Sequence, residues 1–133
     1  MIAVDTNVLI RLLIDDSTAS DQMELAKALL KKNRQVFVPQ IVQVELVWVL
    51  ENAYGFEKNA IIVVLQHLQK SSAYVLQQST QFDAALENFV NHPADFSDYL
   101  ILATCIENHH GVYTFDKKFA RLHSVNLLKD DGL

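Results

Sequence analysis

The sequence predicts an α/β fold of three layers, in which a central parallel sheet lies between helices on both faces. Short apolar runs alternate with segments of helical periodicity along the 133 residues, as in a series of βαβ units. Runs such as 2–4 and 112–115 are uncharged and largely apolar, which is typical of strands covered on both faces. Half of the residues are hydrophobic, so we expect residues 1–133 to form one domain with a sizeable core.

The first part of the chain contains predicted strands that alternate with amphipathic helices. Asp5 ends the first strand or begins the turn after it. Ser20 or Asp21 is a candidate N-cap of the second helix, and Gly55 is a natural stop for the third. The predicted strands are 2–4, 35–38 and 74–76, and the predicted helices are 6–14, 17–33, 40–54 and 59–69.

The same alternation continues to the end of the chain. Thr80 and Asp95 are candidate N-caps, and the helix after Asp95 is expected to end near Gly111. The single cysteine, Cys105, excludes an intramolecular disulfide, and its apolar surroundings predict a small buried thiol. The predicted helices are 80–90, 96–108 and 117–122, and the predicted strands are 112–115 and 125–128.

Isolated acids in apolar segments are the feature that indicates a function. Asp5 is the only charged residue between positions 1 and 10, and Glu45 is the only one between 35 and 50. Asp98 precedes an uncharged run, and Asp116 ends another. An ionised carboxylate in apolar surroundings is costly unless a partner compensates for its lost hydration. Convergence of the four acids on one cation site would account for all of them.

The predicted topology favours such convergence. Asp5 and Asp116 end parallel strands, and open α/β sheets form their ligand crevice outside the carboxyl ends of the strands. Asp98 lies in the first turn of its helix, and first turns gather near the same edge. Glu45 lies on a mostly apolar helical face, so we expect it to point into a buried region that favours negative charge.

Four carboxylates define the chemistry that the site would support. Clustered carboxylates repel one another, and a cation relieves this repulsion. Hard oxygen ligands suit Mg²⁺ or Mn²⁺, whereas zinc would require paired Cys or His at ligand spacing. Two ions about 3.5–4 Å apart can activate water and stabilise the leaving oxygen in phosphodiester cleavage. The pattern leaves open whether one or two ions bind.

Each acid also has a purely structural interpretation. Asp5 can cap the helix that follows it, Asp98 can form a capping box with Asp95, and Asp116 can be an ordinary turn acid. The structural interpretation is weakest for Glu45, because an acid in the middle of a helix caps nothing. For Asp95 we favour the cap over a metal ligand.

Around the four acids, the sequence resembles the PIN-domain nucleases. The segments that carry the resemblance are VDTNVLIR at 4–11, VELVWVL at 44–50, DFSDYLI at 95–101 and TFDKK at 114–118. Each motif is weak alone, but their order and spacing match along nearly the whole chain. The size is that of a VapC-type toxin, the single-domain nuclease of a bacterial toxin–antitoxin pair.

The resemblance implies a PIN-like, Rossmann-like fold and Mg²⁺- or Mn²⁺-dependent cleavage of RNA. It further implies a homodimer and inhibition by a cognate protein antitoxin. The catalytic metal ligands that it supports are Asp5, Glu45, Asp98 and Asp116.

The same resemblance suggests roles for Asn7, Thr114 and Tyr99, and position beside the acids suggests a role for four basic residues. Asn7 and Thr114 occupy positions that commonly support the acids, so we expect them to orient ligands. Tyr99 stands where many relatives carry a small Ala, and its ring would narrow the site or face the substrate. Basic residues that either hold substrate phosphates or form a solvated helix face are Arg11, Lys117, Lys118 and Arg121.

Bulk charge decides little about the partner. The net charge of −5 argues mildly against nucleic acid, but subtraction of the four proposed ligands leaves only −1. No targeting segment or apolar run of membrane-spanning length is visible. We therefore expect a cytoplasmic protein with no membrane partner.

Three alternative functions remain open. A DNA-directed or structure-specific nuclease would use the same acids, because these contact the phosphodiester and not the 2′-hydroxyl. A non-catalytic acidic-pocket module of the same fold would be favoured by the loss of an acid, yet all four positions are acidic. A flavodoxin-like phosphotransfer domain would require paired early acids and a late lysine; Asp5 has no acidic neighbour, and Lys117 is the only candidate lysine.

Overall fold

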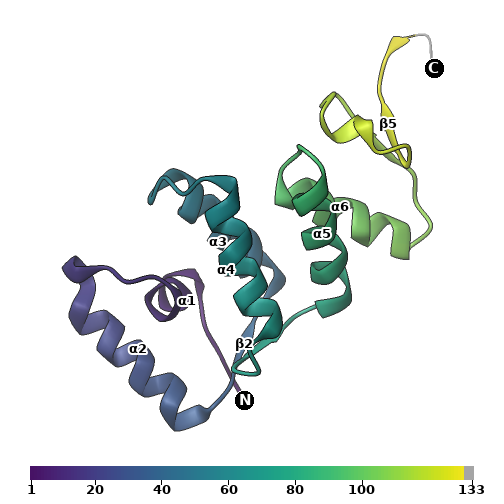
Figure 1. Ribbon diagram of the computed structural model, residues 1–133. Helices are drawn as coiled ribbons and strands as arrows, with labels where there is room; N and C mark the ends of the chain where they lie inside the picture. Colours follow the sequence, from purple (N-terminus) through teal and green to yellow (C-terminus); the bar gives the residue numbers. More distant parts are fainter. Residues whose placement is uncertain (131–133) are drawn as a thin grey trace. The chain divides into compact units, whose positions relative to one another are not determined.

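The computed structural model describes residues 1–130, which form two compact units. The first unit comprises Met1–Ser79, and the second begins at Thr80. Figure 1 shows the helices and strands of each unit along the chain. Every strand pair in the described residues is parallel, as the sequence predicted.

The first unit contains a three-stranded parallel sheet in the order β1-β2-β3. Ile2 pairs with Val36, which in turn pairs with Tyr74. Four α-helices and the 3₁₀ helix η1 accompany the sheet. The strands are β1 (Ile2–Ala3), β2 (Val36–Val38) and β3 (Tyr74–Leu76), and the helices are α1 (Thr6–Leu13), η1 (Ser17–Ala19), α2 (Ser20–Asn33), α3 (Gln40–Asn52) and α4 (Lys58–Lys70).

Leucine side chains from three helices build the core of this unit. Helix α1 packs against α2 and α3, and α3 packs against α4. The leucines with no exposed surface are Leu9, Leu46, Leu50, Leu65 and Leu68. After α3, Gly55 takes a φ of 66°, a conformation that glycine adopts without steric cost. This confirms the predicted stop of the helix.

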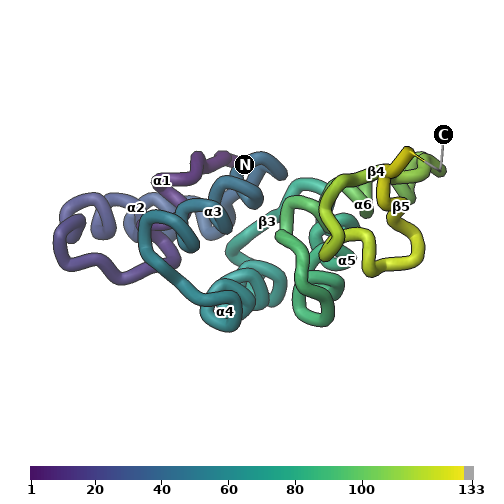
Figure 2. The backbone as a smooth tube through the Cα atoms, turned by 90° about the horizontal axis from the view of Figure 1, so that it is seen from above, coloured from purple at the N-terminus to yellow at the C-terminus, as the bar shows by residue number. Residues whose placement is uncertain are grey.

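The second unit contains two helices followed by a pair of parallel strands. Val112 of β4 pairs with Val125 of β5, and Figure 2 shows these strands side by side. The elements are α5 (Ser79–Asn91), α6 (Phe96–Glu107), β4 (Val112–Thr114), the 3₁₀ helix η2 (Phe119–Arg121) and β5 (Val125–Leu127).

Aromatic rings form the core of the second unit. Phe96 contacts Phe82 and Phe89 edge to face, with ring centroids 5.6 and 5.9 Å apart. Tyr99 contacts Phe119 in the same way at 5.8 Å. Such edge-to-face pairs stabilise a core beyond the burial of their surface. They hold η2 against α6, and therefore fix the position of the turn that carries Asp116.

Four details of the helix ends differ from the prediction. The Asp16 side chain accepts a hydrogen bond from the Thr18 backbone N–H at 3.0 Å and starts η1. Helix α2 therefore begins one short turn later, with Ala19 as its N-cap in place of Ser20 or Asp21. Thr80 lies within α5 and is not a cap. Helix α6 ends before His109, and His109 takes a positive φ, of 60°, in place of Gly111, where the stop was expected. Residues 117–122 contain only the 3₁₀ turn η2 and not the predicted helix.

The expectation of a buried thiol at Cys105 is wrong, because this side chain is half-buried. Helix α6 is apolar on nearly all sides, and it exposes Ile101 and Ile106 by 51% and 55%. Its apolar sequence therefore did not identify the face that packs. No helix within residues 1–130 is long and apolar enough to cross a membrane.

Tyr99 belongs to the core, so its ring does not face a substrate, which was one of the two roles expected from its position beside Asp98. Its side chain has no exposed surface. Its hydroxyl oxygen accepts a hydrogen bond from the backbone N–H of Ala94 at 2.9 Å. Burial raises the pKa of this phenol, and the negative charges of nearby acids act in the same direction. Tyr99 thus fixes the loop that leads into α6.

The hydrogen bond to Ala94 predicts a cost for loss of the Tyr99 hydroxyl. Tyr99→Phe keeps the ring but leaves a buried N–H without its acceptor, which should lower the free energy of unfolding by about 1–3 kcal/mol. Urea denaturation measures the change. Tyr113→Phe is the matched control, because Tyr113 is 66% exposed. Equal stability of the two variants would contradict this role for the hydroxyl.

Candidate functional site

Asp5 lies between β1 and α1 and caps the helix. Its Oδ1 accepts a hydrogen bond from the Val8 backbone N–H at 3.0 Å. Its Oδ2 has no hydrogen-bond partner among residues 1–130, and the side chain is exposed. The structural interpretation of Asp5 is therefore correct, but it uses only one of the two carboxylate oxygens. The other oxygen remains available to a cation.

A long-range hydrogen bond links this turn to Glu45. The Thr6 hydroxyl donates to Glu45 Oε1 at 3.1 Å, across 39 positions of the chain. Thr6 is itself buried, with 8% of its surface exposed. Thr6, which follows Asp5 in the sequence, thus orients Glu45. Asp5 and Glu45 are consequently held at the same end of the first unit.

The surroundings of Glu45 differ from the expectation of a buried region. Glu45 is exposed, and its neighbours on the same face of α3, Ile41 and Trp48, are 69% and 64% exposed. The core contacts of α3 come from the opposite face, where Leu46 and Leu50 are fully buried. When a helix is apolar on two faces, its sequence does not show which face packs against the core. For this reason the prediction that Glu45 points into a buried region is wrong.

Thr6 is a site residue that the sequence analysis did not identify. The supporting role in this turn was assigned to Asn7, which is exposed and lies beside Asp5 at the edge of a cavity. The only available signal was a hydroxyl residue directly after the acid. Its partner on α3 depends on the packing of α1 against α3, which local patterns do not reveal.

In the second unit, Asp95 and Asp98 form the predicted capping box at the start of α6. The Asp98 carboxylate accepts a hydrogen bond from the Asp95 backbone N–H at 3.3 Å. This confirms Asp95 as the cap of the helix. It also holds Asp98 in the first turn, where the positive end of the helix dipole favours a carboxylate.

Asp116 organises the turn between β4 and η2. Its Oδ1 accepts hydrogen bonds from the backbone N–H groups of Lys118 and Phe119, at 2.8 and 3.4 Å. The Asp116 backbone N–H donates to the Thr114 hydroxyl at 3.0 Å. Thr114 was expected to support the acids, and its hydroxyl contacts the backbone of one of them, Asp116. Asp116 fulfils the turn interpretation and leaves Oδ2 without a partner among residues 1–130.

Electrostatics connects the acids of the second unit. The pKa of Asp98 is raised, first by burial and then by the negative charges of Asp95 and Asp116. The backbone hydrogen bond at Asp95 opposes this shift. Asp98 and Asp116, which are separated by a helix and a strand, thus lie close enough to repel each other. A cation between carboxylates would remove this repulsion.

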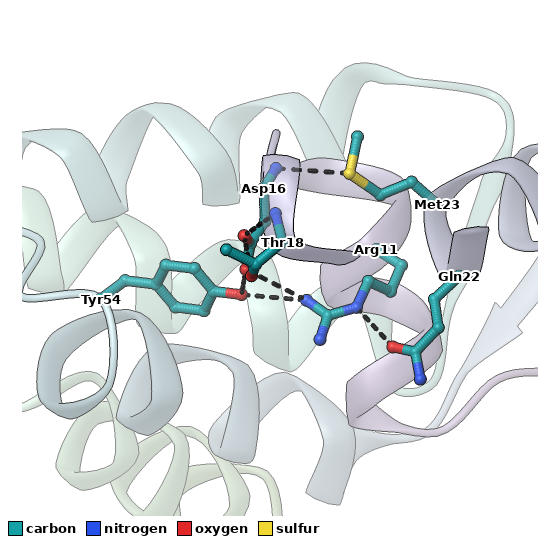
Figure 3. Close-up of polar contacts among 6 residues, drawn as sticks. All are labelled: Arg11, Asp16, Thr18, Gln22, Met23 and Tyr54. Carbon is teal, nitrogen blue, oxygen red and sulfur yellow. Dashed lines mark hydrogen bonds and ion pairs between the residues drawn. The ribbon is translucent and has the colours of Figure 1, made fainter. Parts of the chain in front are cut away.

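Arg11 is held by side chains of the first unit, as Figure 3 shows. Its Nε donates to Gln22 Oε1 at 2.8 Å, and a terminal nitrogen donates to the Tyr54 hydroxyl at 3.0 Å. The same guanidinium lies 3.8 Å from Asp16. The pKa of Asp16 is lowered mainly by its hydrogen bonds with Thr18. Arg11 is thus a fixed group, and its guanidinium is partly committed to neutral and acidic partners.

The remaining basic candidates lie after Asp116. Lys117, Lys118 and Arg121 are exposed, so their side chains can reach a ligand or remain solvated. Their contact with substrate phosphates therefore remains a prediction.

The structure brings the predicted acids together in two pairs. Asp5 and Glu45 are linked through Thr6, and Asp98 and Asp116 interact through their charges. Within residues 1–130, no group of three or more His, Cys, Asp and Glu side chains is arranged to hold a metal ion. Convergence of all four acids remains a prediction. The donor set, carboxylates alone, is chemically suited to a hard divalent cation.

Comparison with known proteins identifies the fold. The family model described as the PIN domain matches residues 2–124, a range that contains all four acids. No curated protein matches the chain in sequence. The six α-helices of residues 1–130 and the parallel strands agree with the predicted three-layer α/β/α architecture. PIN domains are generally nucleases that depend on divalent metal ions. With nearly its whole length matched, the chain belongs to the PIN-domain family.

Proposed function

We propose that this protein is a Mg²⁺- or Mn²⁺-dependent endoribonuclease that acts as the toxin of a bacterial toxin–antitoxin pair. The observation that carries the proposal is the hydrogen bond from Thr6 to Glu45. It joins the acid-bearing turn after β1 to an acid on α3, a link that neither helix capping nor core packing requires. In a metal-dependent nuclease, such a pair of fixed carboxylates can bind the divalent cation.

In this proposal, the four acids bind the cation and the surrounding donors orient them. A bound divalent cation supplies a Lewis acid that activates water and stabilises charge on the phosphodiester. Each acid accepts a hydrogen bond that fixes one of its oxygens, so the carboxylate loses little freedom when it binds a cation. The proposed catalytic residues and metal ligands are Asp5, Glu45, Asp98 and Asp116.

The choice of RNA, of a toxin role and of partners rests on the four motifs and the size of the chain. The proposed partners are an RNA substrate, a protein antitoxin and a second copy of the chain in a homodimer. The exposed side chains after Asp116 supply positive charge for phosphates. These are Lys117, Lys118 and Arg121.

Loss of a proposed ligand should abolish cleavage. The assay uses single-stranded RNA with Mg²⁺ or Mn²⁺. Loss of a residue that only orients a ligand typically lowers activity by about 10- to 100-fold. Asp5→Asn and Asp98→Asn should each lower the cleavage rate by more than this. Asp21→Asn, an exposed acid in the first turn of α2, should cleave like the wild type. DNA of the same sequence, assayed in parallel, should remain intact.

Two outcomes would count against the proposal. Undiminished cleavage by both variants would show that these acids are not ligands. Cleavage of DNA in preference to RNA would support the alternative of a DNA-directed nuclease that uses the same acids.

The Thr6 hydroxyl should control metal affinity without contacting the cation. Thr6→Val keeps the shape of the side chain but removes the donor to Glu45, so the affinity for Mn²⁺ should fall by about 10- to 100-fold. Thr6→Ser retains a hydroxyl and should bind nearly as the wild type does. Calorimetric titration measures both affinities, and urea denaturation checks that the variants are folded. Wild-type affinity in Thr6→Val would rule out the positioning role.

A further inference from the structure

A cavity of about 280 Å³ lies in the first unit between α1 and α2, and Asp5 is one of the residues that line it. We propose that this cavity holds one nucleobase of the substrate, next to the phosphodiester that is cleaved. The inference rests on the proposed function, because it assigns to the same site a contact with the base. A cavity of this size is slightly smaller than ordinary ligand pockets, which suits a single planar ring.

Four of the residues that line the cavity are apolar. Val8 comes from α1, and Leu25, Ala26 and Leu29 come from α2. Leu25 is 72% exposed and Leu29 is 37% exposed, although α2 is otherwise largely polar. Apolar side chains from two helices can cover the faces of a base, as they do where an enzyme binds an unstacked nucleotide. The exposed leucines of α2 thus lie where they can contact the face of a base.

The polar groups of the cavity can recognise the edge of a base. Asn7 offers an amide donor and an acceptor, and Gln22 offers a second amide. Gln22 Oε1 already accepts from Arg11 Nε at 2.8 Å, so the amide nitrogen is the group left for a ligand. Figure 3 shows this contact and the opposite side of Arg11, which is held by Tyr54 and Asp16. The donors are therefore fixed in advance.

Gln22 and Arg11 offer a ligand only donors, and this predicts which bases fit. Donors from Gln22 and Arg11 pair with carbonyl oxygens, and uracil and guanine present such oxygens at their edges. Adenine presents an amino group beside its ring nitrogen, so it should bind more weakly. A peptide helix is a poorer occupant, because helix recognition needs a long groove for anchors at successive turns. The position of Asp5 places the base directly beside the proposed cation ligand.

Nucleosides test the inference without metal and without cleavage. Uridine, guanosine and adenosine carry no phosphate, so the carboxylate of Asp5 does not repel them. In NMR titrations in the presence of EDTA, uridine and guanosine should shift the side-chain amide signals of Asn7 and Gln22, with a Kd on the order of 1 mM. Adenosine should shift them less at the same concentration.

A pair of variants with the same change of charge supplies the control. Leu25→Asp introduces a charge into the apolar wall and should weaken uridine binding at least about tenfold. Val63→Asp, on α4, alters a side chain that is similarly exposed, at 64%, and should bind uridine as the wild type does. Equal binding by both variants would overturn the inference. So would shifts of the same amide signals by an amphipathic peptide when no nucleoside causes any, since the cavity would then serve a protein partner.

The outcome separates this inference from the nuclease proposal. Nucleoside binding in a protein that cleaves no RNA would refute the nuclease and leave the base-binding cavity in place. RNA cleavage by a protein whose cavity binds no nucleoside would refute the cavity alone. If both hold, sequencing of the cleaved ends should show that Leu25→Asp relaxes the base preference beside the cut and that Val63→Asp does not.

Discussion

A carboxylate that is to bind a cation must be held in place, and it must keep an oxygen free. The structure meets this constraint in three ways. Asp5 and Asp116 accept backbone N–H groups at the starts of short helices, and Asp98 takes part in a capping box. Glu45, in the middle of a helix, accepts the Thr6 hydroxyl. In every case, the donor comes from within the same unit.

Structural and functional interpretations of these acids are therefore compatible. A capping bond to Oδ1 of Asp5 or Asp116 leaves Oδ2 directed elsewhere, and the cap reduces the freedom that a bound cation would otherwise have to remove. The pKa of Asp98 is raised first by burial and then by the negative charges of its acidic neighbours, and this repulsion is the cost of the arrangement. A divalent cation bound between these carboxylates would replace their mutual repulsion by attraction to the cation.

Local patterns predicted the helices and strands well, because apolar periodicity and turn residues act over a few positions. The strand Tyr74–Leu76 and the stop at Gly55 are examples. The faces of apolar helices were harder to predict, since α3 and α6 have more than one apolar face. For this reason Glu45 was expected to point inward and Cys105 to be buried, and Tyr99 was expected either to narrow the site or to face the substrate. Each of these features depends on which neighbour the helix packs against.

The acids themselves could be predicted from their isolation among apolar residues, but the groups that orient them could not. The Thr6 contact spans 39 positions, and the cavity beside Asp5 exists only because α1 packs on α2. Such contacts follow from tertiary packing and leave no periodic trace in the sequence. The role of Asn7 remains a prediction for the same reason, although it borders that cavity beside Asp5.

Paramagnetic broadening by Mn²⁺ tests the central claim most directly, because the ion broadens NMR signals only of nearby nuclei. If the four acids share one cation site, substoichiometric Mn²⁺ should broaden the backbone amide signals of Asp5, Glu45, Asp98 and Asp116 together, before those of other acidic residues. Broadening confined to one of the two pairs, or spread equally over exposed acids such as Asp21 and Glu87, would contradict the account.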